Sequence, residues 1–356
     1  MEFGVCMAAK IDDLDYIDLM EDLGYTDLWV ADSQMIWSDC YAVMALAAAR
    51  TTRLRIGTGV AVAGTRPAAV TATAHATINR IAPGRVFCGI GTGNTAMRIM
   101  GHKPIPMAEF DEYLTTLRTL LDGEEATVRW RGQTAPARHL MQDAGFVAFR
   151  PRMPMYVSAF GPKATALAAK HGDGLVMSVP PDPAAIQSVR NRFLEAAREA
   201  GRSEPDSHFT FTTLNTMVVL EEGERTDSDR VKRECGAFAV AGLHYTYEQF
   251  RQYGRRPPEF LDDIWGEYVA MLDEVPEERR HLRIHLGHNC WVEPEEERFI
   301  TKELIERTCL VGTPQQLADT VRGLEAAGLT QIMLLPPLEA KARVLRSVAE
   351  QVFPLL

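Results

Sequence analysis

The stretch 54-LRIGTGVAVAGTRPAAVTATAHATINRIAPGRVFCGIGTGN-94 contains two short apolar runs separated by a longer segment of different period. The runs at 54–60 and 85–91 are apolar at consecutive positions, which predicts strands that are buried on both faces. Residues 67–82 between them follow the helical period. A unit of this kind predicts two neighbouring strands of a parallel sheet, with the connecting helix packed on its face.

The same alternation of apolar runs and helical segments continues over most of the chain. Eight such units favour an α/β fold of the closed (β/α)8 TIM barrel type over an open doubly wound sheet. The candidate strands are 2–7, 27–32, 54–60, 85–91, 155–160, 174–179, 209–220 and 331–336.

Two segments, about 125–154 and 221–307, are longer than the connections of a barrel require. The second is rich in charge, and we expect a mostly helical insertion before the last strand that supplies a lid or a subunit interface. The whole chain, 1–356, is expected to form a single domain that carries both insertions.

The composition favours a small-molecule substrate. The chain has 48 acidic and 38 basic residues and a net charge of −10, which disfavours nucleic acid or an anionic membrane as the main partner. Six cysteines are scattered without metal-binding spacing, which fits a reduced, cytoplasmic protein. The N-terminal sequence does not resemble a signal peptide, and no run reaches the roughly 18 apolar residues of a membrane span.

The segment 91-GTGNTA-96 matches the G-x-G-x-x-A pattern of dinucleotide-binding loops. In a Rossmann fold this loop belongs to the first strand–helix unit, but here three units precede it. The acids at the expected distance, Asp111 and Glu112, fall inside a helical segment, so nicotinamide binding of this type is excluded. Two interpretations remain: close approach of the backbone to a flat or phosphorylated ligand, or a tight turn without a ligand.

Two other strands end in residues that suit a binding site. The second places Asp32, Ser33 and Trp37 at the carboxyl end of the barrel, where active sites of this fold lie. Asp32 is also a candidate cap for the following helix, and Trp37 a candidate for ordinary packing. The third strand loses its strand character at Gly57 and Gly59, which predicts a bulge into the barrel mouth.

The fifth strand runs through Gly161 into a helix that opens with Pro162 and Lys163. Free amide groups and the positive end of the helix dipole at this position predict a phosphate cradle.

Four segments together resemble the bacterial-luciferase-like superfamily, in particular its coenzyme F420-dependent reductases and dehydrogenases such as methylenetetrahydromethanopterin reductase. They are the opening stretch from Gly57 onward, "DLWVADSQMIW", "VSAFGPKATALAAKHGDGLVMSV" and "LVGTPQQLADTVRGLEAAGLTQIML". The resemblance covers roughly 1–180 and 305–356. It implies a TIM barrel, commonly a homodimer, that binds a flavin or deazaflavin across its mouth. It also implies a non-prolyl cis peptide behind the cofactor ring, here Gly59–Val60.

The resemblance also implies which residues form the site. Those mapped to the cofactor are Asp32, Gly59, Val60, Ala61, Thr92, Gly93, Asn94, Ser158, Ala159, Gly161, Pro162, Lys163 and Gly174. The catalytic candidates are Asp32, Ser33, Trp37, Asn94 and His288.

Two of these positions depart from the F420-dependent sugar-phosphate dehydrogenase of the same branch. Ser33 stands where that enzyme has a catalytic His, and Asn94 stands where it has a Glu. An unactivated Ser is no base near neutral pH and Asn does not titrate, so oxidation of a sugar hydroxyl by that route is not expected.

His281, His285 and His288 have spacings of four and three, which would place them on one helical face. No Glu completes an HExxH pattern, so no metal is expected, and His288 is considered as a proton donor above the pocket.

These observations lead to a single functional expectation with two alternatives. We expect hydride transfer between F420 and a small organic substrate, since such a cofactor carries the chemistry and the protein positions the substrate. One alternative is an FMN-dependent two-component monooxygenase served by a separate flavin reductase. The other is a non-catalytic flavin-binding barrel.

Overall fold

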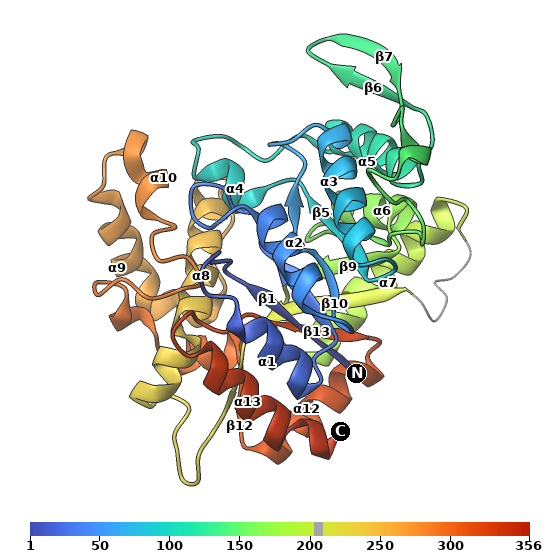
Figure 1. Ribbon diagram of the computed structural model, residues 1–356. Helices are drawn as coiled ribbons and strands as arrows, with labels where there is room; N and C mark the ends of the chain where they lie inside the picture. The colour runs from blue at the N-terminus through green and yellow to red at the C-terminus, as the bar shows by residue number, and fades with distance from the viewer. Residues whose placement is uncertain (203–208) are drawn as a thin grey trace.

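The computed structural model describes residues 1–202 and 209–356, and its centre is a closed barrel of eight parallel strands surrounded by helices (Figure 1). Pairing of β3 with β5 closes the barrel, with Ile56 opposite Val86. The predicted (β/α)8 TIM barrel is therefore confirmed. Its strands are β1 (Glu2–Met7), β2 (Asp27–Val30), β3 (Arg55–Thr58), β5 (Val86–Gly91), β8 (Met155–Ser158), β9 (Gly174–Met177), β10 (Thr210–Asn215) and β13 (Gln331–Leu334).

The third strand is interrupted in the way the glycines predict. After β3 ends at Thr58 the chain bulges, and it returns to the edge of β5 as β4 (Ala61–Val62). The peptide bond Gly59–Val60 is cis, as the resemblance implies.

Side chains alternate between the inside and the outside of the barrel. On β2, Leu28 and Val30 pack outward under the helices, whereas Trp29 points inward. Inside the barrel Trp29, Phe87 and Tyr156 stack with ring centroids 4.4 to 5.6 Å apart. The interior below the mouth is therefore a packed aromatic layer.

The outer ring of the barrel consists of helices that connect successive strands. Several begin at a capping side chain: Asp39 accepts two backbone N–H bonds at the start of α2, and Thr313 forms a capping box with Gln316 at the start of α12. The helices are α1 (Asp15–Leu23), α2 (Cys40–Arg50), α3 (Ala68–Ile81), α4 (Asn94–Arg98), α5 (Met107–Leu121), α6 (Pro162–His171), α7 (Pro183–Glu199), α12 (Pro314–Ala326) and α13 (Lys341–Gln351).

The prediction of one strand over 209–220 is wrong, because the chain leaves the barrel at Thr216. Beyond β10 it forms β11 (Met217–Val219), which pairs in parallel with β12 (Leu310–Gly312) outside the barrel. The side chain of Asn215 makes this change of direction possible, since its Oδ1 accepts the backbone N–H groups of Thr216 and Leu310.

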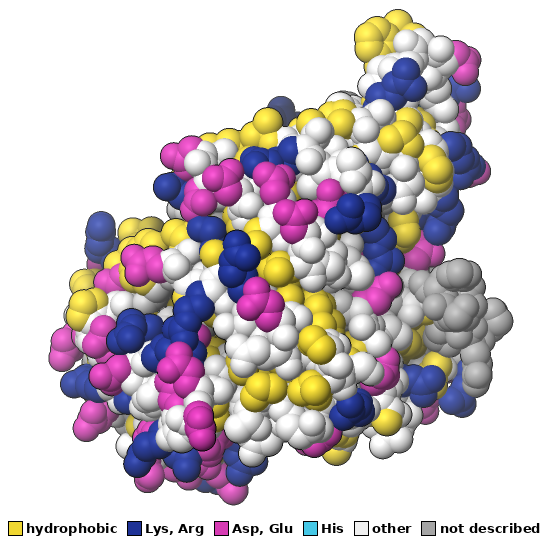
Figure 2. All heavy atoms as spheres, turned by 60° about the horizontal axis from the view of Figure 1, so that its bottom comes forward, with side chains coloured by type: hydrophobic (Ala, Val, Ile, Leu, Met, Phe, Trp, Pro, Cys, Tyr) yellow, Lys and Arg dark blue, Asp and Glu magenta, His cyan; other side chains and the backbone are white. Residues whose placement is uncertain are grey.

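The two long segments form separate additions to the barrel. Residues 125–154 contain an antiparallel hairpin, β6 (Ala126–Trp130) and β7 (Gln133–Ala137), which projects from the body (Figures 1 and 2), and η1 (Gln142–Ala144). Residues 221–307 pack around a hydrophobic core of their own that includes Leu243, Tyr268 and Phe299. Their helices are α8 (Asp229–Tyr253), η2 (Glu259–Leu261), α9 (Asp262–Asp273), η3 (Glu277–Arg279), α10 (Arg280–Arg283), η4 (Glu297–Phe299) and α11 (Lys302–Thr308).

The surface carries charges of both signs. On the described part of the face in Figure 2, Lys and Arg side chains are interspersed with Asp and Glu. None of the helices in residues 1–202 and 209–356 is long and apolar enough to cross a membrane.

Candidate active site

The bulge after β3 is fixed by a buried ion pair at the barrel mouth. Asp32, only 5% exposed, accepts the N–H of Val62 at 3.2 Å and pairs with the guanidinium of Arg66. Arg66 also reaches the exposed Asp39 at 3.2 Å. Asp32 follows β2 and Arg66 precedes α3, so the pair joins two strand ends and holds β4 in place.

The glycines after β5 serve strand packing. A Cβ on Gly89 would lie 2.1 Å from the carbonyl oxygen of Thr58, and one on Gly93 would lie 2.4 Å from Val62. Gly93 also has φ +84°, which favours glycine. Protein atoms therefore occupy the space on the Cβ side of these two glycines, so their lack of a side chain is explained by packing, and the expected approach of a ligand to this loop stays a prediction.

The start of α6, where a phosphate cradle is predicted, has no side-chain cap. Gly161 precedes the helix and provides no capping side chain, and Pro162 is the first helical residue. No heavy atom of the described chain lies within 4 Å of the position that a Cβ on Gly161 would occupy. Ser158 ends β8, and the buried Ala159 donates its N–H to Val176 at 2.9 Å, which fixes the turn. The first amides of α6 and the exposed Lys163 thus face open space.

The segment 221–307 supplies a wall beside the mouth. The indole N–H of Trp37 points to the sulfur of Cys290 at 3.3 Å, and the Trp37 ring lies 5.7 Å from that of His288. The hydroxyl of Tyr245 on α8 lies 2.9 Å from that of Thr95 and 3.3 Å from His288 Nε2. Burial raises the pKa of Tyr245 to about 12, so this hydroxyl keeps its proton at neutral pH.

Two of the predicted site residues, Gly174 and Asn94, lie apart from this arrangement or point elsewhere, whereas Ser33 lies at the mouth. Gly174 is at the amino end of β9 and pairs with Tyr156, so it is not at the mouth. Asn94 is exposed, and its side chain accepts the Nε–H of Arg98 along α4. Ser33 is buried at the mouth, where its carbonyl oxygen accepts the N–H of Trp37.

The structure gathers a different set of histidines from the one that the spacing suggested. His281 lies on α10 near Gly101, whereas His285 and His288, in the turn after α10, meet His244 of α8. Burial and the neighbouring His285 and His244 lower the pKa of His288 well below its usual value. His288 is therefore neutral at neutral pH and lacks the charge of a strong proton donor.

Sequence reasoning missed the residues that α8 brings to the mouth. Phe238 packs against Trp29 and its neighbours inside the barrel, and Tyr245 contacts the loop after β5. Neither belongs to a recognisable motif. The only available signal was the length of the second insertion, which suggested a lid without naming its residues.

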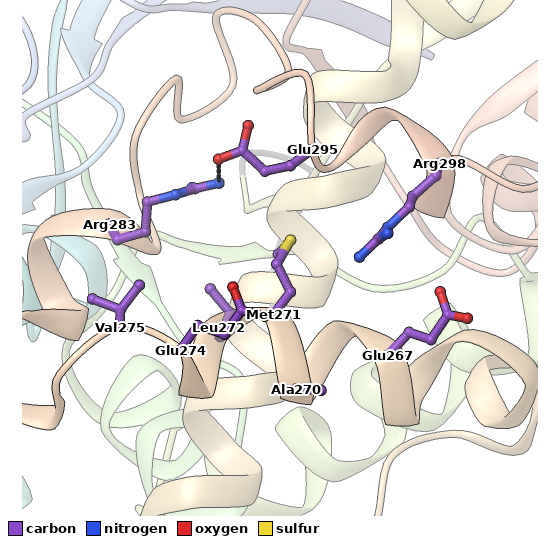
Figure 3. A pocket seen from close by; sticks show the side chains of 9 residues that line it. All are labelled: Glu267, Ala270, Met271, Leu272, Glu274, Val275, Arg283, Glu295 and Arg298. Atoms are coloured by element: carbon purple, nitrogen blue, oxygen red, sulfur yellow. Dashed lines mark hydrogen bonds and ion pairs between the residues drawn. The ribbon is translucent and has the colours of Figure 1, made fainter.

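A charged hollow of about 760 Å³ lies on the outer side of this segment (Figure 3). Arg283 and Glu295 form an ion pair of 2.7 Å across it. The hollow is lined by Glu267, Ala270, Met271, Leu272, Glu274, Val275, Arg283, Glu295 and Arg298, none of which belongs to the mouth described above.

Comparison with known sequences identifies related proteins along nearly the whole chain. The sequence profile of the family described as luciferase-like monooxygenase matches residues 2–331. The 5,10-methylenetetrahydromethanopterin reductase of Archaeoglobus fulgidus is 25% identical over 345 residues, which cover 96% of this chain and 94% of the relative.

Comparison with solved structures identifies the same barrel. The coenzyme F420-dependent tetrahydromethanopterin reductase of Methanopyrus kandleri superposes with a TM-score of 0.74 at 19% identity, covering 99% of this chain and 98% of the other. The oxygenating constituent of 3,6-diketocamphane monooxygenase of Pseudomonas putida, in complex with FMN, has a TM-score of 0.64 at 16% identity and covers 100% and 98% of the two chains.

Proposed function

We propose a specific reaction for this chain, which belongs to the luciferase-like monooxygenase family and is an oxidoreductase of that kind. It transfers a hydride between coenzyme F420 and a small organic substrate. The observation that carries this proposal is the open, uncapped start of α6 beside a mouth walled by α8. The reductases named above support F420 over FMN, since the sequence relative covers almost the whole chain and the F420-dependent structure has the higher TM-score.

The residues at α6 fit a phosphorylated cofactor. Lys163 is exposed, and no acidic partner for it is found among the described residues. The free amides, the helix dipole and this lysine together suit an anionic group. A bound deazaflavin supplies or accepts the hydride, so the protein needs no nucleophile of its own.

The remaining residues of the mouth position the substrate and exclude water. The pair of Asp32 and Arg66 fixes the bulge on one side, while Trp37 and Phe238 cover the aromatic interior with apolar surface. Tyr245 joins this wall to the loop after β5 and keeps its proton there. Binding in such an enclosed site brings the two reacting carbons together, which is the main contribution a protein makes to hydride transfer.

The test is a parallel anaerobic titration of the purified apo-protein with F420 and with FMN, followed by fluorescence. We expect F420 to bind at least about tenfold more tightly, a difference of about 1.4 kcal/mol. Exclusive binding of FMN, with consumption of oxygen after reduction, would support the monooxygenase alternative instead.

Two further results would contradict the proposal. Failure to bind either cofactor removes it altogether. Binding of F420 without any substrate-dependent change of its redox state, over a panel of carbonyl, imine and alcohol substrates, would indicate a non-catalytic barrel.

A further inference from the structure

Three histidines from two separate segments converge inside the second insertion. His244 lies in α8, and His285 and His288 lie in the turn after α10. All three are buried, with exposed fractions of 2% to 5%. One ring nitrogen of each lies within 4.8 Å of the others.

Hydrogen bonds at the Nε2 atoms determine which nitrogens remain free. His244 Nε2 lies 2.9 Å from a carboxylate oxygen of Glu296, and His285 Nε2 lies 2.9 Å from one of Glu248. Since a carboxylate only accepts, both Nε2 atoms carry a proton, so Nδ1 is the nitrogen of each ring that is available to a ligand.

Among the described residues, the Nδ1 atoms have no hydrogen-bond partner other than one another. His244 Nδ1 is buried without a hydrogen-bond partner. His285 Nδ1 and His288 Nδ1 lie 3.3 Å apart. The Nε2 of His288 lies 3.3 Å from the hydroxyl of Tyr245 and 3.0 Å from the side-chain amide of Asn289, whose Oδ1 is buried without a hydrogen-bond partner. If the amide is turned so that Oδ1 accepts the Nε2–H, the Nδ1 of His288 carries a lone pair, whereas in the other orientation the amide donates to Nε2 and the Nδ1–H bonds to His285. In the first of these two arrangements three buried nitrogen lone pairs lie near one another, and one shared cation would pair with all three.

We propose that His244, His285 and His288 bind a first-row divalent transition-metal ion, for which Zn²⁺ is the probe, through their Nδ1 atoms. Zinc–nitrogen bonds of about 2.0–2.1 Å in a tetrahedral site place two ligand atoms about 3.3–3.4 Å apart. The Nδ1 atoms of His285 and His288 lie 3.3 Å apart, and the ligand nitrogens of all three histidines lie within 4.8 Å of one another. The spacing of His281, His285 and His288 predicts no metal, and His244, which lies on another helix, was not part of that pattern.

The surroundings of the three rings resemble those of known zinc sites. Histidine ligands commonly donate their second N–H to a carboxylate, which fixes the ring and raises its basicity. Here Glu296 and Glu248 fill that position and are themselves buried. Arg98 lies 3.3 Å from Glu248, and Arg283 lies 3.7 Å from Glu296, so both carboxylates are held in place.

The histidine cluster lies beside the barrel mouth. Three protein ligands leave the fourth position of a tetrahedral ion to water or to a substrate group. His288 lies against Trp37 at the mouth, while Arg283 on the far side belongs to the charged hollow (Figure 3). Metal binding is measured on the protein without its cofactor, so its outcome is independent of the proposed function.

The experiment uses the full chain after treatment with a chelator and desalting. Zn²⁺ is added and its stoichiometry and affinity are measured by elemental analysis and competition with a chromophoric chelator, with Co²⁺ as a spectroscopic probe. We expect one ion per chain, and visible d–d bands typical of four- or five-coordinate nitrogen ligation for Co²⁺. His244→Gln and His285→Gln should abolish stoichiometric binding, and Glu296→Gln should weaken it about 10- to 100-fold.

His281→Gln is the matched control, since His281 lies in the same segment and outside the cluster. It should bind Zn²⁺ like the unaltered protein. The proposal is overturned by clearly substoichiometric binding, by binding that persists in His244→Gln, or by binding that His281→Gln removes. If circular dichroism shows that His244→Gln does not fold, Glu296→Gln decides, and an unchanged affinity in that variant overturns the proposal.

Discussion

His75 is a buried histidine whose environment makes stability depend on pH. Its Nδ1 lies 2.8 Å from the carbonyl oxygen of Thr71, and its Nε2 lies 3.3 Å from the hydroxyl of Thr58 at the end of β3. Burial lowers the pKa of His75 to about 4. The hydrogen bond to the Thr71 carbonyl acts in the opposite direction and raises the pKa, whereas the nearby charge of Arg66 lowers it further. In the unfolded chain the pKa is about 6.5, so the unfolded state takes up the proton first as the pH falls.

The stability contributed by neutral His75 is therefore complete above pH 6.5 and is lost as the pH falls toward 4. Between about pH 6.5 and pH 5 the loss should reach about 2 kcal/mol, at about 1.4 kcal/mol per unit. Urea unfolding of the native protein and of His75→Gln at both pH values measures it. The variant should lose less stability over this interval, and an equal loss in both proteins would show that His75 is not responsible.

Asp32 and Asp39 provide a comparison of two carboxylates that share one arginine. Asp32→Asn removes the buried charge that faces Arg66 and weakens its bond to the Val62 amide. We expect a loss of about 2 kcal/mol in the free energy of unfolding, typical of a buried hydrogen bond to a charged group. Asp39→Asn should cost less than about 1 kcal/mol, because Asp39 is exposed and Asn also caps a helix.

Chemical denaturation at neutral pH distinguishes the two variants. If both variants lost a similar free energy of unfolding, the burial of Asp32 would not increase its contribution to stability. The importance of Asp32 was predictable from sequence because it directly follows a buried strand. Its arginine partner was not assigned, since the bulge that brings Arg66 to it is a tertiary feature.

At the scale of elements, the start of α6 can be tested by exchanging its cap. Gly161→Asp should stabilise the helix by about 0.5 kcal/mol, since Asp is the better N-cap and complements the dipole. The same carboxylate would repel a phosphate at this site, so we expect cofactor affinity to fall at least about tenfold.

Gly161→Asn is the neutral control, with almost the same shape and capping ability. Thermal unfolding and cofactor titration should show two stable variants, of which only Gly161→Asp binds poorly. Equal affinity of the two variants would place the phosphate elsewhere.

Element boundaries were predictable only where burial changes along the chain. The barrel strands β1, β2, β3, β5, β8 and β9 end close to the predicted positions, because each apolar run stops where the chain leaves the barrel. The run 209–220 does not stop at the end of the barrel strand. β10 is buried in the barrel and β11 is buried between α13 and α8, so the apolar pattern continues through Thr216. The histidine cluster was missed for a related reason, since helical spacing relates residues within one element and His244 lies in another.

For the whole molecule, the count of strand–helix units was enough to predict closure of the barrel. The mouth was predictable in part, because all parallel strands end there. The residues that wall the mouth could not be predicted. The helices of 221–307 pack around a hydrophobic core of their own, and the packing of this core determines which of their side chains reach the barrel.

We propose a homodimer formed through α2 and α3, which pack side by side on the outside of the barrel (Figure 1). Leu46 of α2 and Val70 of α3 are 46% and 51% exposed, which leaves apolar side chains on the outer surface of both helices. In a twofold interface each substitution occurs twice, so Leu46→Glu with Val70→Glu would bring four carboxylates into an apolar contact.

Light scattering after gel filtration should show a dimer for the native chain and a monomer with unchanged circular dichroism for this variant. Trp130→Glu, at a similarly exposed position on the β6–β7 hairpin, should remain dimeric; a monomeric native chain, or dissociation by the hairpin variant alone, would contradict this arrangement.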